Sequence, residues 1–105
     1  MNSTVPVANL DLALKALANP LRRQILDWLR DPETHFPQQE HAFLLGVCAG
    51  QIERKCALAQ STVSGHLGTL QRAGLITCQK LGQIHFFKRC EETIAQLAQA
   101  LEVRL

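Results

Sequence analysis

Residues 60–76 read QSTVSGHLGTLQRAGLI, a stretch that combines an amphipathic helix, a helix stop and the start of a strand. The apolar residues of the helix are spaced i, i+4 and i+7 and so share one face: Val63, Leu67 and Leu70. Gly74 follows this helix, which we expect over residues 60–73, where a C-cap glycine is favoured. From Ile76 onward the apolar period changes from that of a helix to that of a strand.

A two-stranded β-hairpin is predicted over residues 76–88. Apolar and polar residues alternate on both sides of Gly82-Gln83, a dipeptide suited to a two-residue turn. In the first strand the residues that share one face are Ile76, Cys78 and Lys80. In the second strand Ile84 and Phe86 alternate with His85 and Phe87.

Helices are also predicted before residue 60. The first spans residues 10–18, and its apolar side comprises Leu10, Ala13, Leu14 and Leu17. The second begins at Asn19-Pro20, because Asn is a good N-cap and Pro is favoured at the first helical position. It runs to about Arg30 with a buried stripe of Leu21, Ile25, Trp28 and Leu29. A short third helix over residues 47–56 is joined to the 60–73 helix by a tight connection through residues 57–59.

Two further segments complete the chain. Residues 31–46 are predicted to form a long loop, because Pro32 and Pro37 disfavour a regular element. The loop contains apolar residues that should be buried: Phe43, Leu44 and Leu45. A last helix is expected over residues 91–105, and its apolar stripe comprises Ile94, Leu97, Ala98, Leu101 and Leu105.

The order of helices, hairpin and final helix predicts a mainly α (α+β) fold, the winged helix-turn-helix, with five helices and a two-stranded wing. We expect one domain over residues 1–105, with an N-terminal tail over residues 1–9 and the helix-turn-helix over residues 47–73. The hydrophobic content of 47% argues against disorder. A chain of this length buries a modest core, for which dimerisation is a common remedy.

Charge is strongly polarised along the chain, although the net charge is only +2. Residues 54–90 contain no Asp or Glu and six bases, a net charge of +6. The remaining residues carry all 9 acids and 5 of the 11 bases, a net charge of −4. An acid-free basic segment suits a polyanion such as DNA. The alternative interpretation is a chance clustering of bases on a solvated face.

The face opposite the leucines of the 60–73 helix has a composition of its own. It contains no acid and no large apolar residue; its members are Ser61, Gly65, Gly68 and Arg72, flanked by Thr62, Ser64 and Thr69. Small hydroxylated residues at a helix N-terminus can bond base edges or phosphates. Any amphipathic surface helix, however, is polar on its outer side, and the two glycines fit either close approach to DNA or tolerant surface positions.

Three motifs resemble the ArsR-type family, whose members are dimeric winged-helix repressors that in many cases release DNA on binding a metal or metalloid. They are Ala18-Asn19-Pro20-Leu21-Arg22-Arg23-Gln24-Ile25-Leu26, then Gln60-Ser61-Thr62-Val63-Ser64-Gly65-His66-Leu67, then Leu70-Gln71-Arg72-Ala73-Gly74-Leu75-Ile76. The resemblance covers about residues 10–101. It implies that the 60–73 helix recognises DNA, that the hairpin is the wing, and that the helices at 10–18 and 91–105 form the dimer interface.

The resemblance also implies a set of DNA-binding residues. In the recognition helix they are Gln60, Ser61, Thr62, Ser64 and His66, to which the outward-facing Arg72 is added. In the wing they are Lys80, Gln83 and His85, with Lys88 beyond them. His66 lies at the flank of the buried face, so packing is its alternative role. Gly65 and Ala59 depart from the family, which usually carries a longer side chain and a capping Ser there.

The family's inducer sites are mostly missing. A Cys-x-Cys-Asp pattern on the third helix would fall here on Cys48, Gly50 and Gln51, which keeps one thiol and is insufficient for thiolate ligation. A second known site needs His on the last helix, which has only Glu91, Glu92 and Glu102. Cys48 remains the candidate for a thiol-reactive or metalloid inducer, with His35, Glu40 and His41 able to approach it. The alternative is that Cys48, Cys56, Cys78 and Cys90 are ordinary structural residues.

We therefore expect a regulator that binds double-stranded operator DNA as a homodimer, with no cofactor and no metal site of its own. The alternatives are a winged-helix protein-interaction module without DNA binding and a thiol enzyme using Cys48. The enzyme is disfavoured because no Cys-His pair stands in a catalytic sequence context. No signal peptide, membrane span or CxxC pair is evident, so a cytoplasmic chain with reduced thiols is predicted.

Overall fold

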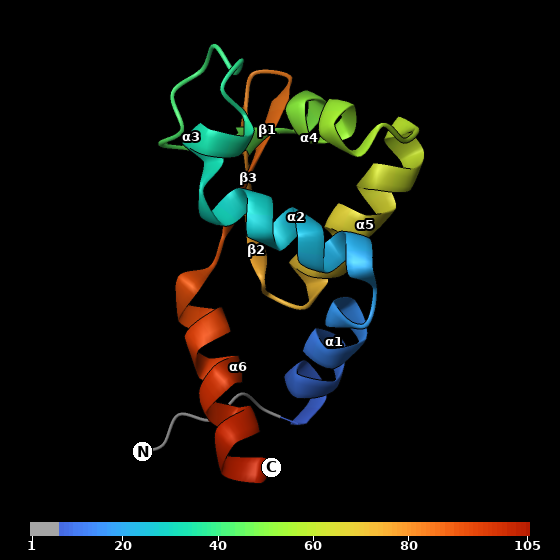
Figure 1. Ribbon diagram of the computed structural model, residues 1–105, viewed down its shortest axis with the longest axis vertical. Helices are drawn as coiled ribbons and strands as arrows, with labels where there is room; N and C mark the ends of the chain where they lie inside the picture. The colour runs from blue at the N-terminus through green and yellow to red at the C-terminus, as the bar shows by residue number, and fades with distance from the viewer. Residues whose placement is uncertain (1–6) are drawn as a thin grey trace.

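A computed structural model describes residues 7–105, which form six helices and a three-stranded antiparallel sheet (Figure 1). The helices are α1 (Val7–Leu17), α2 (Pro20–Arg30), α3 (Pro32–His35), α4 (Ala49–Cys56), α5 (Gln60–Arg72) and α6 (Glu91–Arg104). The strands are β1 (Val47–Cys48), β2 (Ile76–Leu81) and β3 (Ile84–Arg89), in the order β1-β3-β2. The fold is the predicted winged helix-turn-helix, with one more short helix and one more strand than expected.

The extra strand corrects the predicted start of the third helix. Val47 pairs with Phe87 and Cys48 with Phe86, so that α4 begins at Ala49 and not at residue 47. Val47 is fully buried, and the β3 edge supplies backbone partners that a helix at this position would not use. The sheet register also assigns the faces: paired residues share a face, so Cys78, Phe87 and Val47 lie on one side of the sheet.

The segment between α3 and β1 is organised by one side chain, Gln39. Its amide nitrogen donates to the carbonyls of His41 and Gly46, both at 3.1 Å, and its Oε1 accepts the backbone N–H of Cys48 at 2.9 Å. The imidazole of His41 packs edge-on against Phe86, with ring centroids 5.4 Å apart. The loop therefore covers the face of the sheet that carries Phe86.

The predicted burial of Leu44 is wrong, because this side chain is 80% exposed. Of its neighbours, Phe43 packs against the core and Leu45 is half-buried. A turn closed by the Gly46 N–H on the carbonyl of Phe43 at 2.9 Å points the three apolar side chains in different directions, so they are not all buried.

The N-terminal helices follow their predicted signals with small shifts. The Asn19 Oδ1 accepts the backbone N–H of Arg22 at 3.1 Å, which confirms Asn19 as the N-cap of α2. α1 begins at Val7, so residues 7–9 are helical and not part of a tail; residues 1–6 lie outside the described residues. Its buried face is Leu10, Ala13 and Ala16. Leu14, predicted on that face, is 44% exposed.

α5 ends as predicted from Gly74, the glycine that follows it. The N–H of Leu75 bonds to the carbonyl of Leu70 at 3.1 Å, and the N–H of Gly74 bonds to that of Gln71 at 2.9 Å. Gly74 has a φ of +77°, so this is a Schellman motif that turns the chain directly into β2. Gly82 opens the two-residue turn between β2 and β3 with a φ of +62°.

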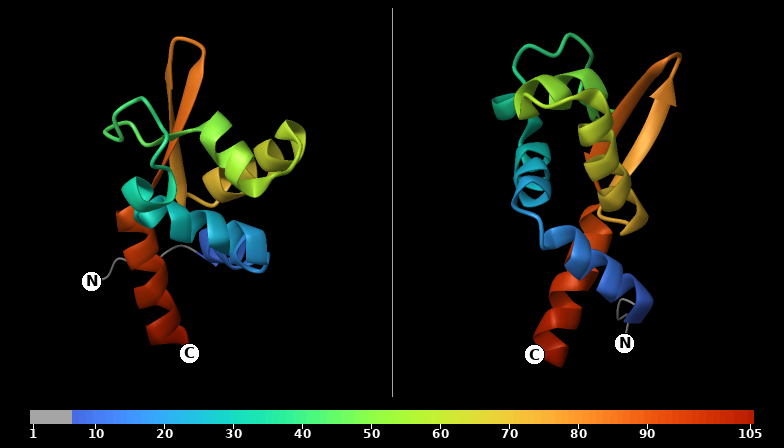
Figure 2. Two further views of the ribbon diagram at one scale, coloured as in Figure 1. Left: turned by 45° about the horizontal axis from the view of Figure 1, so that its top comes forward. Right: turned by 90° about the vertical axis from the view of Figure 1, so that its right-hand side faces the viewer.

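α1 and α6 lie together at one end of the long axis, and α4 and the wing tip lie at the other (Figures 1 and 2). In α6 the buried residues are Leu97 and Ala100. Ala98 and Leu105, predicted in its apolar stripe, are exposed. No helix within residues 7–105 is long and apolar enough to cross a membrane.

Candidate nucleic-acid interface

Three buried residues hold α5 in place: Val63, Leu67 and Leu70. This is the predicted core face. α5 packs against β2, α4 and α1, and its outer side is open to solvent. Gly65 lies on that outer side with open space around it. Gly68, predicted on the same outer face, is covered by Arg72, whose Nη1 would lie 3.3 Å from a Cβ at residue 68.

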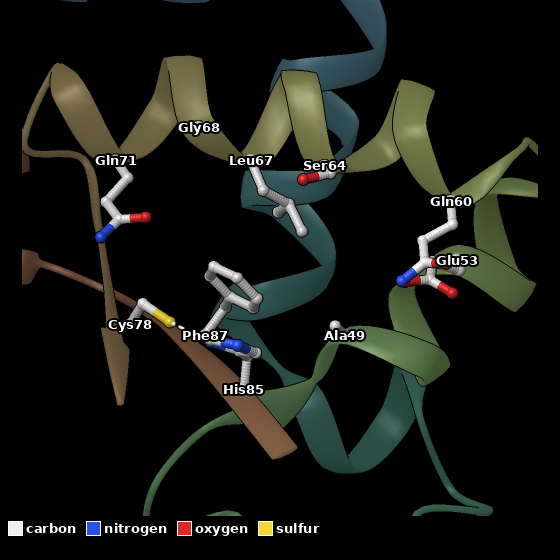
Figure 3. Close-up of a pocket in the computed structure, with 10 residues that line it drawn as sticks. All are labelled: Ala49, Glu53, Gln60, Ser64, Leu67, Gly68, Gln71, Cys78, His85 and Phe87. Carbon is white, nitrogen blue, oxygen red and sulfur yellow. Dashed lines mark hydrogen bonds between the residues drawn. The ribbon is translucent and has the colours of Figure 1, made fainter. Parts of the chain in front are cut away.

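The predicted residues of the recognition motif divide between two sides of α5. Gln60 and Ser64 line a groove between α5 and the wing, together with Gln71 (Figure 3). Ser61 and Thr62 are exposed; helical spacing places Ser61 on the side of Gly65 and Thr62 on the side of His66. The first turns of α5 therefore present short polar side chains across its whole free surface. Helical spacing identifies Gln71 as a further groove residue, because it lies seven positions after Ser64.

The wing supplies the opposite wall of this groove, which has a volume of about 430 Å³. Lys80 and His85 are cross-strand partners on the face that also carries Phe87. Both are exposed, and His85 lines the groove beside Phe87 (Figure 3). Gln83 lies in the exposed turn at the wing tip. The structure thus brings Lys80 and His85 to the same side of the molecule as α5, with Gln83 at the wing tip.

His66 points toward α2 and not outward. Its Nδ1 lies 3.1 Å from Nη1 of Arg22, and the side chain is half-buried. The same guanidinium donates through Nε to the carbonyl of Ala16 at 2.7 Å and through Nη2 to that of Lys15 at 3.1 Å. Because a guanidinium only donates, Nδ1 of His66 is the acceptor. His66 therefore connects α5 to the end of α1 and to α2.

The acid-free segment does not form one basic patch. Arg89 is ion-paired with Glu91 at 2.9 Å and also donates to the carbonyl of Leu26. Lys88 donates to the carbonyl of Leu44 at 2.9 Å. Lys55 lies over the ring of Trp28, 5.3 Å from its centroid.

Two bases neighbour residues that line the α5–wing groove: Arg72 lies against Gly68, and Lys80 is the cross-strand partner of His85. Sequence reasoning missed Glu53, an acid outside the basic segment that lines the α4 end of the groove (Figure 3). No sequence pattern predicts that Glu53 lines the groove, because its position depends on how α4 packs against α5.

The cysteines are free thiols, and each is half-buried. Cys48 is the N-cap of α4 and lines a cavity of about 390 Å³ with His41 and Glu40. The structure places His35 in a different cavity, with Phe36 and Lys55. In residues 7–105 no three His, Cys, Asp or Glu side chains come together as a metal site.

Cys78 lies on the opposite face of the sheet from Cys48. Its Sγ is 3.5 Å from Nδ1 of His85. Burial raises the pKa of the Cys78 thiol and that of Cys56 above their ordinary value.

Proteins with a similar sequence include transcriptional regulators. The chain is 43% identical over 93 residues to an uncharacterized HTH-type transcriptional regulator, YbzH of Bacillus subtilis, covering 87% of this chain and 93% of that one. It is 35% identical over 74 residues to the transcriptional activator HlyU of Vibrio cholerae, covering 70% of this chain and 56% of that one. No protein-family model matches the chain.

Solved structures share the fold. The crystal structure of an ArsR family transcriptional regulator superposes with a TM-score of 0.74 at 18% identity, over 97% of this chain and 92% of that chain. HlyU from Vibrio cholerae superposes with a TM-score of 0.59 at 27% identity, over 91% of each chain. These likenesses show the fold, and the sequence identity to YbzH places the chain among transcriptional regulators and not among enzymes. The chain belongs to the family of HTH-type transcriptional regulators that includes YbzH, and its fold is that of the ArsR family regulator of known structure.

Proposed function

We propose that this regulator binds a specific double-stranded DNA operator as a homodimer in the cytoplasm and represses by covering it. The observation that carries the proposal is the free surface of α5, which is short-chained, polar and acid-free and stands beside the exposed wing. A helix of this kind fits the major groove, where base edges are read. The proposal requires no cofactor.

The N-terminal half of α5 would read the bases. Gln60, Ser61, Thr62 and Ser64 are short enough to let the helix backbone approach the groove floor, and the bare Gly65 removes any obstacle to that approach. Arg72 at the other end of α5 would contact a phosphate. His66 contributes by positioning, because its ring is engaged with Arg22.

The wing would contact the DNA backbone beside the recognition helix. Lys80, Gln83 and His85 are exposed, and the first and last of them lie on the wing face that borders the groove. Phosphate contacts of this kind position a protein on the duplex and carry most of the salt dependence of its affinity. Two recognition helices related by a two-fold axis would enter successive major grooves about 34 Å apart.

The test begins with selection of bound sequences from a random duplex pool, followed by anisotropy titration of the selected duplex at several salt concentrations. Ser61→Glu should weaken binding by at least about tenfold, because it sets a carboxylate against the DNA. A carboxylate in the first turn also suits the helix dipole, so the variant should fold normally. Gln99→Glu adds the same charge on α6 and should leave affinity unchanged.

Failure to select any sequence, with no salt-dependent binding to duplex DNA, would favour the alternative, a protein-interaction module. The direction of regulation needs its own measurement, because the relative HlyU is named an activator. A reporter placed behind the selected operator should be lowered by the wild type and not by Ser61→Glu. A reporter that rises in a Ser61-dependent way would replace repression by activation.

We further propose that any release of DNA by arsenite or peroxide depends on Cys48. Cys48 caps α4, the first helix of the helix-turn-helix, and its backbone N–H is held by Gln39. Sulfur would replace one hydroxyl of arsenous acid with loss of water, or be oxidised to a sulfenic acid as peroxide is reduced to water. Either group enlarges the side chain where the loop and α4 meet. Unchanged release from Cys48→Ala would show that the thiol is not the sensor.

A further inference from the structure

The wall of the α5–wing groove contains a thiol and an imidazole in contact. Cys78 in β2 and His85 in β3 lie on one face of the hairpin as diagonal cross-strand neighbours, because Cys78 pairs with Phe87 and His85 with Lys80. Sγ of Cys78 and Nδ1 of His85 are 3.5 Å apart (Figure 3). Phe87 lies buried beside Cys78, and the groove opens in front of the pair.

We propose that Cys78 and His85 together bind a soft, thiophilic monovalent metal ion of the Cu(I) and Ag(I) class. A cysteine sulfur selects soft ions, and imidazole nitrogen is a good second ligand for them. With the ligand distances of zinc, about 2.3 Å to sulfur and about 2.0 Å to nitrogen, the two donor atoms are about 3.5 Å apart in a bent arrangement and about 4.3 Å apart in a linear one. The observed separation of 3.5 Å equals the bent value. A linear arrangement requires the two donor atoms to move apart by about 0.8 Å.

The number of donors favours this class of ion over zinc. Structural zinc takes four protein ligands and catalytic zinc takes three. In the described part of the chain no such group of three is present. Glu53, the acid that lines the same groove, stands at its α4 end, on the far side from Cys78 and His85 (Figure 3). Two protein donors suit an ion that accepts low coordination.

The Cys78 thiol carries a proton that metal binding must displace. A thiophilic ion replaces that proton: the S–H bond breaks, the sulfur–metal bond forms and the proton passes to solvent. The lone pair of Nδ1 of His85 makes the second bond, and no electron is transferred.

The test uses proteins that keep one thiol each. The Cys78-only variant carries C48S, C56S and C90S; the matched Cys56-only variant carries C48S, C78S and C90S. Cys56 is an apt control, because it is also a half-buried thiol whose pKa is raised by burial. Each reduced protein is titrated with Ag(I) against thiourea as competing ligand, and the ring nitrogens of His85 are followed by NMR.

The Cys78-only protein should bind one Ag(I) at least about tenfold more tightly than the Cys56-only protein. His85→Gln should remove that difference, and Nδ1 of His85 should shift on titration. Equal affinities, or ring nitrogens that do not respond, would overturn the proposal. If the triple variants do not fold, the His85 resonance in the wild type against Cys78→Ser gives the same decision. No DNA is present, so the result is independent of the operator proposal.

Discussion

Gly46 occupies a position that no other residue fits. Its φ is +112°, and a Cβ there would overlap the carbonyl oxygen of Phe87. Gly46 is also where the Gln39 amide fastens the loop to β1. Gly46→Ala should therefore lower the free energy of unfolding by at least about 2 kcal/mol, as measured by urea denaturation.

Gly65 is the control for that substitution and should respond with the opposite sign. It lies inside α5 with no heavy atom near the position of a Cβ. Gly65→Ala should raise the free energy of unfolding by about 1 kcal/mol, because glycine is a poor residue in a helix interior. A stabilised Gly46→Ala, or a destabilised Gly65→Ala, would contradict the backbone described for these two positions.

Arg22 is the second residue whose chemistry cannot be exchanged. One guanidinium reaches three acceptors on α1 and α5, with distances between 2.7 and 3.1 Å. A lysine ammonium is a point donor and cannot span them. Arg22→Lys should lower the free energy of unfolding by about 1–2 kcal/mol. Within residues 7–105 the side chain of the neighbouring Arg23 bonds to one acceptor, the carbonyl of Leu17, so Arg23→Lys should change stability by less than about 0.5 kcal/mol.

The sequence predicts well the helices and strands whose ends are marked by a cap or turn motif within a few residues. α2 follows from Asn19-Pro20, the end of α5 from Gly74, and the hairpin from Gly82-Gln83, because each stop or turn is encoded within a few residues. β1 carries no such signal. Two residues become a strand only because β3 passes beside them, and that contact joins positions about 40 apart in the chain.

The same distinction applies to the candidate site. Spacing along α5 separates its buried residues from its exposed ones, and alternation places Lys80 and His85 on one face of the wing. The engagement of His66 with Arg22 needs the packing of α5 against α2, which periodicity places only at the flank. The contact between Cys78 and His85 depends on hairpin register and rotamers together, so a spacing of seven residues does not reveal it.

The N-terminus of α5 has no side-chain cap, and a substitution at the N-cap position could supply one. Ala59 is the N-cap and makes no side-chain hydrogen bond. Its backbone already has the extended conformation of an N-cap, so a serine hydroxyl could accept a free N–H of the first turn. Ala59→Ser should raise the free energy of unfolding by about 1 kcal/mol. Ala95→Ser, at an exposed interior position of α6, should lower it by about 0.5 kcal/mol, and equal effects at both sites would rule out capping.

For the molecule as a whole, exposed apolar side chains form two main groups. One lies at the wing and comprises Leu44, Leu81 and Ile84. The other lies on the two helices at the end of the long axis far from the wing tip: Leu12, Leu14, Ala98, Val103 and Leu105. On α6 a stripe at i, i+4, i+7 and i+11 joins half-buried to exposed positions: Ile94, Ala98, Leu101 and Leu105. That is the pattern of a helix that packs against another helix, and here the second copy of the chain is the partner we propose.

Ala98 is the position where this proposal is most sharply tested. It is exposed in one chain, so Ala98→Glu leaves the monomer core intact. In a two-fold interface the carboxylate appears twice and is buried without a partner. The dimer dissociation constant should rise by at least about tenfold, as measured by sedimentation equilibrium, and operator affinity should fall with it. Gln99→Glu, one residue along on another side of α6, should leave a normal dimer. If Ala98→Glu dimerises as Gln99→Glu does, the two copies meet elsewhere, and the spacing of the recognition helices has to be derived from a different surface.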